Sequence, residues 1–164
     1  MSLIGPGEEH GVLERMVGEW NQTARLQGVP GMDATETKIT ASATFVLGGR
    51  FLQQVTKGEF MDMPWDTLSF FGFDRRREVY TLVGFDTLGT YYITAEGKYN
   101  NAADTLTLSG SDDDPVMGVV KEFTYVITFL DDGSFTTELS FSDEMHTRGE
   151  ADSVTIMTAT STRR

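Results

Sequence analysis

The chain contains no cysteine among its 164 residues. This absence excludes disulfides, zinc–thiolate sites, iron–sulfur clusters and thiol nucleophiles, and it fits the reducing cytoplasm. No run approaches the roughly 18 apolar residues that span a bilayer. Basic residues are also few, because 13 lysines and arginines stand against 25 acidic residues, for a net charge of −12. Such a surface repels phosphate backbones and anionic lipid, so we expect neither a nucleic-acid nor a membrane partner.

Histidine is nearly as scarce, with only His10 and His146. Neither stands in a His-x-His or His-Glu-x-x-His zinc motif, and Gly-x-Ser-x-Gly and glycine-rich phosphate loops are also missing. We interpret the acidic runs 112–114 and 131–132 as turns, since they lack the ligand spacing of a calcium loop. We therefore expect no metal and no cofactor. The first seven residues lack a basic start and an apolar stretch, so we expect no secretory signal and a cytoplasmic location.

What the chain does contain is a long series of segments in which apolar residues recur at every second position. Ile39, Ala41 and Ala43, for example, alternate with polar neighbours, as in a half-buried strand. Turn residues separate the segments, among them residues 28–31 and the pair Gly48-Gly49, which we interpret as a two-residue hairpin turn. The expected strands are 20–26, 38–47, 50–60, 65–73, 77–86, 90–99, 104–110, 117–130, 134–143 and 152–162.

About ten strands joined by short connections predict an all-β fold, an antiparallel up-and-down barrel in a single domain over residues 1–164. A two-sheet sandwich is the alternative, but it usually needs long crossovers, which the pattern lacks. Residues 7–17 predict a short N-terminal helix, because Leu13, Met16 and Val17 recur at helical spacing. We expect this helix to lie across one end of the barrel.

Gly18 and Trp20 on the first strand, with Arg163 on the last, resemble the calycin arrangement of lipocalins and fatty-acid-binding proteins. The resemblance implies that the arginine packs over the tryptophan and closes the bottom of the barrel, with Arg164 as the alternative partner. A guanidinium can stack on an indole and donate to nearby carbonyls. Gly18 leaves room where the chain enters the barrel.

Motifs over nearly the whole chain resemble those of the DUF1579 family of calycin-like proteins. They are Gly18-Glu19-Trp20, Leu47-Gly48-Gly49-Arg50-Phe51-Leu52, Gly72-Phe73-Asp74, Tyr80, Asp86 with Gly89-Thr90, Gly97, Leu106-Thr107-Leu108-Ser109-Gly110, Glu138 and Arg163. Two positions depart from the family pattern, with Gly84 in place of a tryptophan and Arg75 in place of an asparagine. The resemblance implies a fold and no reaction.

Some calycin-like barrels bind haem through a histidine near the C-terminal end. His146 is therefore a candidate axial ligand on the strength of the resemblance. We interpret it instead as a solvated histidine in a hairpin, and we interpret His10 as a surface residue of the helix.

Side chains alone do not fill the lumen of a barrel of about ten strands. Further room is left by the small residues Ala41, Ala43, Ala95 and Gly97. We therefore predict a pocket for a small, mostly hydrophobic ligand. The candidate ligand-binding residues are Phe45, Phe71, Phe73, Asp86, Tyr92 and Glu138. Further aromatic residues that could line the pocket are Phe51, Trp65, Phe85, Phe123 and Tyr125.

Two alternatives stay open. If Asp86 or Glu138 points into an apolar lumen, beside a partner such as Arg50 or Arg148, it can serve as a general acid or base, and the protein is then an enzyme. In the other alternative, the outer apolar face or an exposed edge meets a second copy, and the protein is a homodimer.

Overall fold

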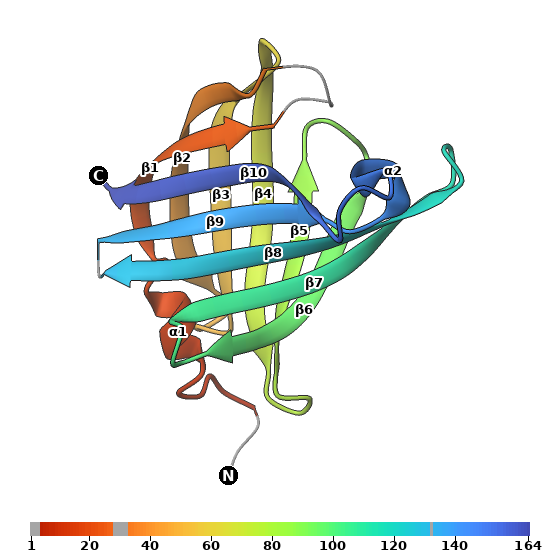
Figure 1. Cartoon of the computed structure of the whole chain (residues 1–164). Helices are drawn as coiled ribbons and strands as arrows, with labels where there is room; N and C mark the ends of the chain where they lie inside the picture. Colours follow the sequence, from red (N-terminus) through yellow and green to blue (C-terminus); the bar gives the residue numbers. More distant parts are fainter. Residues whose placement is uncertain (1–3, 28–32, 132) are drawn as a thin grey trace.

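The computed structural model describes residues 4–27, 33–131 and 133–164, and the turn predicted at residues 28–31 lies outside these ranges (Figure 1). The described part holds ten strands and two short helices. In chain order they are α1 (His10–Glu14), β1 (Gly18–Leu26), β2 (Thr35–Val46), β3 (Phe51–Phe60), β4 (Met63–Asp74), β5 (Val79–Asp86), β6 (Tyr92–Asn100), β7 (Thr105–Asp114), β8 (Val119–Asp131), β9 (Ser134–Phe141), α2 (Glu144–Thr147) and β10 (Val154–Arg163).

The strands form one closed antiparallel barrel, in which each strand pairs with its neighbours in sequence and β1 pairs with β10. The closing pair runs from Trp20 opposite Arg163 to Leu26 opposite Met157. The predicted ten-stranded, all-β, up-and-down barrel is therefore confirmed. Closure also excludes the two-sheet sandwich.

Strict alternation decides which side chains enter the barrel. In β1, Trp20, Gln22, Ala24 and Leu26 are buried, whereas the residues between them are exposed. This period of two follows from the pleat of the strand. The alternation predicted for residues 20–26 therefore matches the buried and exposed faces of β1.

The barrel has two different ends (Figure 1). The closed end carries α1 together with the β2–β3, β4–β5 and β6–β7 turns. The open end carries the β3–β4, β5–β6 and β7–β8 turns and α2. No helix of the described residues is long and apolar enough to cross a bilayer.

Helix α1 is shorter than the predicted 7–17, because the chain continues after Glu14 with the tighter bonds Met16 N to Leu13 O and Val17 N to Glu14 O. The β2–β3 turn is also longer than predicted. It spans residues 47–50 rather than the glycine pair alone, and Leu47 shares positive φ angles with Gly48 and Gly49.

Two segments that we predicted as turns have other structures. Residues 112–114 continue strand β7, where Asp112 and Asp114 share a face and both approach Lys121 of β8. Residues 144–147 form α2, a helical turn capped by the side chain of Asp143 rather than a plain hairpin. The ion pairs with Lys121 come from another strand, whereas the cap of α2 is Asp143, the residue directly before the helix.

Candidate functional site

At the closed end, Trp20 and Arg163 lie against each other. Trp20 is almost fully buried, and the Arg163 guanidinium carbon lies 4.4 Å from the centre of the indole ring. Arg163 Nη1 donates to the carbonyl of Val17 at 2.9 Å, and Trp20 Nε1 donates to the carbonyl of Met16 at 2.8 Å. These bonds satisfy the carbonyls after α1 and tie the helix to the barrel.

Gly18 makes room for this arginine. Its φ is 128°, and a Cβ built on it would lie 2.7 Å from Arg163 Nη1. An L side chain rarely adopts such a backbone conformation. The backbone conformation and the contact with Arg163 therefore explain why glycine occupies the first position of the Gly-x-Trp motif.

The interior next to this end is filled. Leu13, Met16 and Phe71 are buried in one cluster with Trp20, and the Trp20 and Phe135 rings meet edge to face at 4.8 Å. Ala41 and Ala43 belong to the same cluster, and Ala41 lies directly opposite Trp20 across the β1–β2 ladder. These alanines therefore accommodate large neighbours, and the space that we predicted beside them is occupied.

A cavity of about 180 Å³ lies in the other half of the barrel, toward the open end. Its aromatic walls are Trp65, Phe85, Tyr91, Phe123 and Tyr125. Its polar lining includes Gln22, Gln54, Thr56, Thr67, Ser69 and Thr137. The lumen is thus hollow where the inward-facing side chains are small or polar.

Several polar groups of the lining bond to one another. Gln22 Nε2 donates to the buried Ser161 Oγ at 2.9 Å, and the hydroxyls of Thr56 and Thr67 lie 2.7 Å apart. Burial raises the pKa of Tyr125, against the lowering effect of its hydrogen bond with Thr137. The Tyr125 phenol therefore stays neutral near pH 7.

One polar atom of the lining has no such partner. Trp65 Nε1 is buried and makes no hydrogen bond to any described residue. An unpaired buried donor costs about 1–3 kcal/mol. An acceptor placed in the cavity within reach of this N–H would remove that cost.

Of the six candidate ligand-binding residues, Asp86 is the one that lines the cavity. Phe71 is buried in the core cluster, and Phe45 and Phe73 pack against it at the closed half. Their height along the barrel places all three in the filled half.

Tyr92 and Glu138 lie on the outside of the barrel. Tyr92 is 62% exposed, because its neighbours Tyr91 and Ile93 are the residues that line the cavity. Glu138 is exposed between the inward-facing Thr137 and Leu139, and its Oε1 accepts from Thr155 Oγ1 at 3.3 Å. Neither side chain contributes to the cavity.

Asp86 stands at the end of β5, at the mouth of the cavity. Its Oδ1 accepts a hydrogen bond from Leu88 N at 2.8 Å. The predicted partners lie elsewhere: Arg50 donates to the carbonyls of Ile4 and Leu47 at the closed end, and Arg148 follows α2 as its C-cap. Within the described chain, Asp86 has no ion pair.

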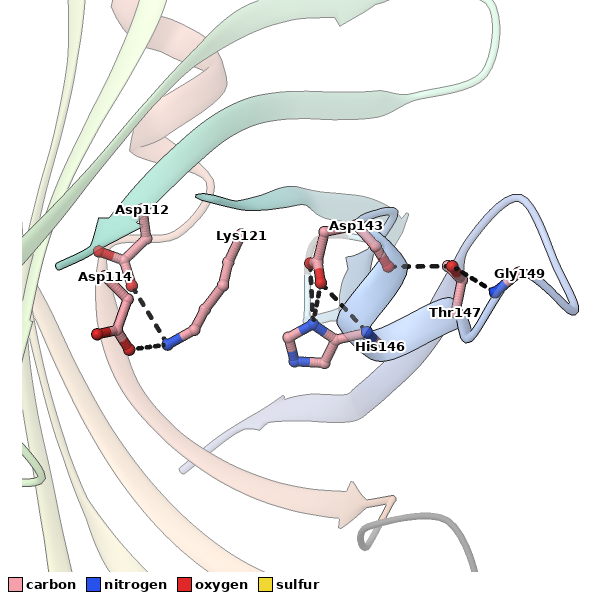
Figure 2. Close-up of polar contacts among 7 residues, drawn as sticks. All are labelled: Asp112, Asp114, Lys121, Asp143, His146, Thr147 and Gly149. Atoms are coloured by element: carbon pink, nitrogen blue, oxygen red, sulfur yellow. Dashed lines mark hydrogen bonds and ion pairs between the residues drawn. The ribbon is translucent and has the colours of Figure 1, made fainter. Parts of the chain in front are cut away.

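His146 sits in α2 at the rim of the open end (Figure 2). Its Nδ1 lies 2.8 Å from both carboxylate oxygens of Asp143, and its ring stacks on Phe141 at 4.1 Å. Burial acts to raise the pKa of Asp143, but hydrogen bonds from the His146 ring and backbone lower it overall. His146 is thus a packed and bonded side chain, 21% exposed, rather than a solvated one.

A second polar group at this end joins β7 and β8 (Figure 2). Lys121 Nζ lies 2.8 Å from Asp114 and 3.9 Å from Asp112. The hydrogen bond from Lys121 holds the pKa of Asp114 below its usual value. The lysine therefore offsets part of the negative charge of this pair.

His10 also differs from the sequence interpretation, since it is buried rather than at the surface. It is 8% exposed, its ring meets Phe73 at 6.3 Å, and its Nδ1 accepts from Gly7 N at 3.1 Å. It serves the packing of α1. Among the described residues, no group of three or more histidines and carboxylates is placed to hold a metal ion.

The comparisons with known proteins agree with this fold. Rv2717c from M. tuberculosis has a crystal structure similar to this chain, with a TM-score of 0.67 and 15% identity over 96% of this chain and 98% of that one. This likeness concerns the fold alone. No curated protein matches the sequence. The model of DUF1579, described as a protein of unknown function, matches residues 5–163, and the chain therefore belongs to the DUF1579 family.

Proposed function

We propose that this barrel binds a small, largely apolar molecule in the cavity at its open end. The observation that carries the proposal is an aromatic-walled space of about 180 Å³ in a lumen that is otherwise filled. An apolar cavity of ~150 Å³ is large enough to hold benzene. The matching ligand is one aromatic or aliphatic ring with a short substituent.

The ligand also carries a hydrogen-bond acceptor. Trp65 Nε1 is a buried donor without a partner among the described residues, and it belongs to the cavity wall. A carbonyl or hydroxyl oxygen at this point would pair the donor that the barrel leaves unpaired. Shape thus selects the apolar body, and Trp65 selects the polar end.

Two probes of nearly equal shape test both parts. Acetophenone carries a carbonyl acceptor, and ethylbenzene does not. Titration followed by NMR should show that both bind and that acetophenone binds more tightly. Trp65→Phe should remove that difference.

A substitution that fills the cavity supplies the second arm. Ala159 lines the cavity, whereas its neighbour Thr158 is exposed on the outer face of β10. Ala159→Phe should abolish binding of both probes, and Thr158→Phe, the matched control, should preserve it. If both probes fail to bind, or if they still bind to Ala159→Phe, the proposal is wrong.

The catalytic alternative now depends on Asp86, since Glu138 faces outward. Asp86 lies at the cavity mouth, where a carboxylate can reach a bound molecule. If a bound substrate is converted to product and Asp86→Asn abolishes this turnover, the protein is an enzyme. Tight binding without turnover keeps the function as binding.

Self-association is the other alternative, and exposed apolar side chains at the open end favour it. They are Met61, Met63, Leu88, Val116, Met117 and Met145. Light scattering over a dilution series should separate a monomer from a homodimer. For location we propose the cytoplasm, which rests on the lack of cysteine.

A further inference from the structure

We infer that the ligand of this cavity is a cation, an apolar amine whose ammonium group lies against Asp86 and whose acceptor oxygen pairs with Trp65 Nε1. The inference rests on the proposed function, because it names the chemical class that the same cavity selects. It follows from the charges at the cavity, from the aromatic residues near Asp86 and from the net charge of the molecule.

The cavity lining carries one carboxylate, that of Asp86, and among the described residues no lysine, arginine or histidine. Asp86 receives a hydrogen bond from Leu88 N but no ion pair from the described chain. The other acidic pair on the inner face at this end, Asp112 and Asp114, already has Lys121 beside it. Asp86 is thus the carboxylate at the mouth for which a ligand would supply the positive charge.

Two aromatic residues lie near this carboxylate. Asp86 lies opposite Thr67 in the β4–β5 ladder, and Trp65 is two residues away on the same face of β4. Such diagonal neighbours lie about 7–8 Å apart, within reach of a large ring. Tyr91 lines the same mouth, whereas the ring of Phe85 meets Tyr92 on the outer face. A cation over the face of an aromatic ring is favoured further.

The charge of the whole molecule points the same way. Its net charge is −12. The open end carries the acidic residues Asp62, Asp112, Asp114, Asp143, Glu144 and Glu150 together with Lys121 and Arg148. Such an excess of negative charge attracts cations and repels anions.

An anionic ligand has no matching group here. Its carboxylate would lie near Asp86, and the described lining offers it no cation. Like charges at such a site repel, and a buried charge without a partner is costly. The Trp65 N–H could bond to such an anion, but one neutral donor does not offset a facing carboxylate.

Three compounds of nearly equal shape test the inference at pH 7 and low salt: 2-phenylethylamine, 2-phenylethanol and phenylacetate, which are respectively cationic, neutral and anionic. Calorimetric titration should show the amine binding about tenfold more tightly than the alcohol, a ratio typical of one charge-assisted contact. Phenylacetate should bind most weakly. Added salt should weaken the binding of the amine and leave the affinity for the alcohol unchanged.

Asp86→Asn removes the charge and keeps an oxygen that can accept from Leu88 N. This variant should bind the amine only as tightly as the alcohol, and its affinity for the alcohol should equal that of the unmodified protein. Glu138→Gln removes a carboxylate from the outer face and is the matched control, with all three affinities preserved.

The outcomes separate the inference from the proposed function. If the alcohol binds but the amine gains nothing, or keeps its advantage in Asp86→Asn, the cation inference is wrong and the binding cavity remains. If phenylacetate binds most tightly, the inference is also wrong. If none of the three compounds binds, the proposed function fails and the inference fails with it.

Discussion

The two ends of this barrel are built from the same ten strands, yet one is filled and the other is hollow. At the closed end, Trp20, Phe71 and Phe135 occupy the lumen, and Arg163 lies over the indole. At the open end, Gln22, Thr137 and other small or polar side chains leave a cavity. Strand alternation decides which residues face inward, but side-chain volume at each level decides where the lumen stays open.

The largest effect that we expect comes from Trp20→Ala. Loss of this buried ring should lower the free energy of unfolding by ~3–5 kcal/mol, because the packing against Phe135 and the contact with Arg163 are both lost. Urea denaturation measures the change. Trp65→Ala at the hollow end is the control and should cost less than half as much. Equal costs, or a loss below ~1 kcal/mol for Trp20→Ala, would remove the contrast between the ends.

A smaller loss should follow from Gly18→Ala. The φ of 128° at Gly18 is unfavourable for alanine, which gives an expected cost of ~1–3 kcal/mol. Gly11→Ala is the matched control, since a Cβ there meets nothing within 4 Å and alanine favours the helix. The same denaturation series compares the two variants. If Gly18→Ala is as stable as Gly11→Ala, the backbone at the barrel entrance has no special requirement.

Alkaline pH should weaken the closed end through Tyr80. Burial raises the pKa of Tyr80 to about 12, with a further contribution from Glu9, and its hydroxyl donates to the Glu9 carbonyl at 2.9 Å. The folded state therefore holds this proton more tightly than the unfolded state, whose tyrosine pKa is ~10. The resulting stability is complete below pH ~10 and is lost as the pH rises toward 12.

Urea midpoints between pH 9 and 12 should reveal this loss. Tyr80→Phe should reduce the slope of the urea midpoint against pH. Part of the slope should remain, because the pKa values of Tyr99 and Tyr125 are also raised. An unchanged slope in Tyr80→Phe would show that this hydroxyl does not couple to folding.

The smallest effects concern two adjacent tyrosines at the open end. Tyr91 lines the cavity, whereas Tyr92 lies on the outside and meets Phe85 at a ring distance of 6.0 Å. Tyr91→Ser should weaken the binding of 2-phenylethanol several-fold, and Tyr92→Ser should leave it within about twofold, since only the first removes a wall of the pocket. Calorimetry makes the comparison. A greater loss with Tyr92→Ser would mean that the ligand sits elsewhere.

Much of the fold could be predicted from the sequence, because its information is local. Alternation predicts the strands, and short turn segments predict their order. The closed, ten-stranded barrel follows from these features. The position of Arg163 over Trp20, in contrast, is implied by the resemblance to calycins.

The position of the cavity could not be predicted, because it depends on the side chains that ten strands bring to the same height. Ala41 suggested space, but Trp20 lies opposite it and uses that space. Tyr92 lies opposite Phe85 in the β5–β6 ladder, and this pairing with the neighbouring strand turns Tyr91 rather than Tyr92 toward the cavity. Similarly, the partner of Asp112 and Asp114 comes from the next strand, and nothing in the residues 112–114 themselves points to Lys121.

The most direct test uses the two tryptophans, one at each end of the lumen. Their indole N–H groups give two signals in a nitrogen-15 NMR spectrum, and Trp65→Phe assigns them. On titration with 2-phenylethanol, the Trp65 signal should shift and saturate, while the Trp20 signal stays in place. A Trp65 signal that does not move, or two signals that move together, would contradict a ligand site confined to the open half of the barrel.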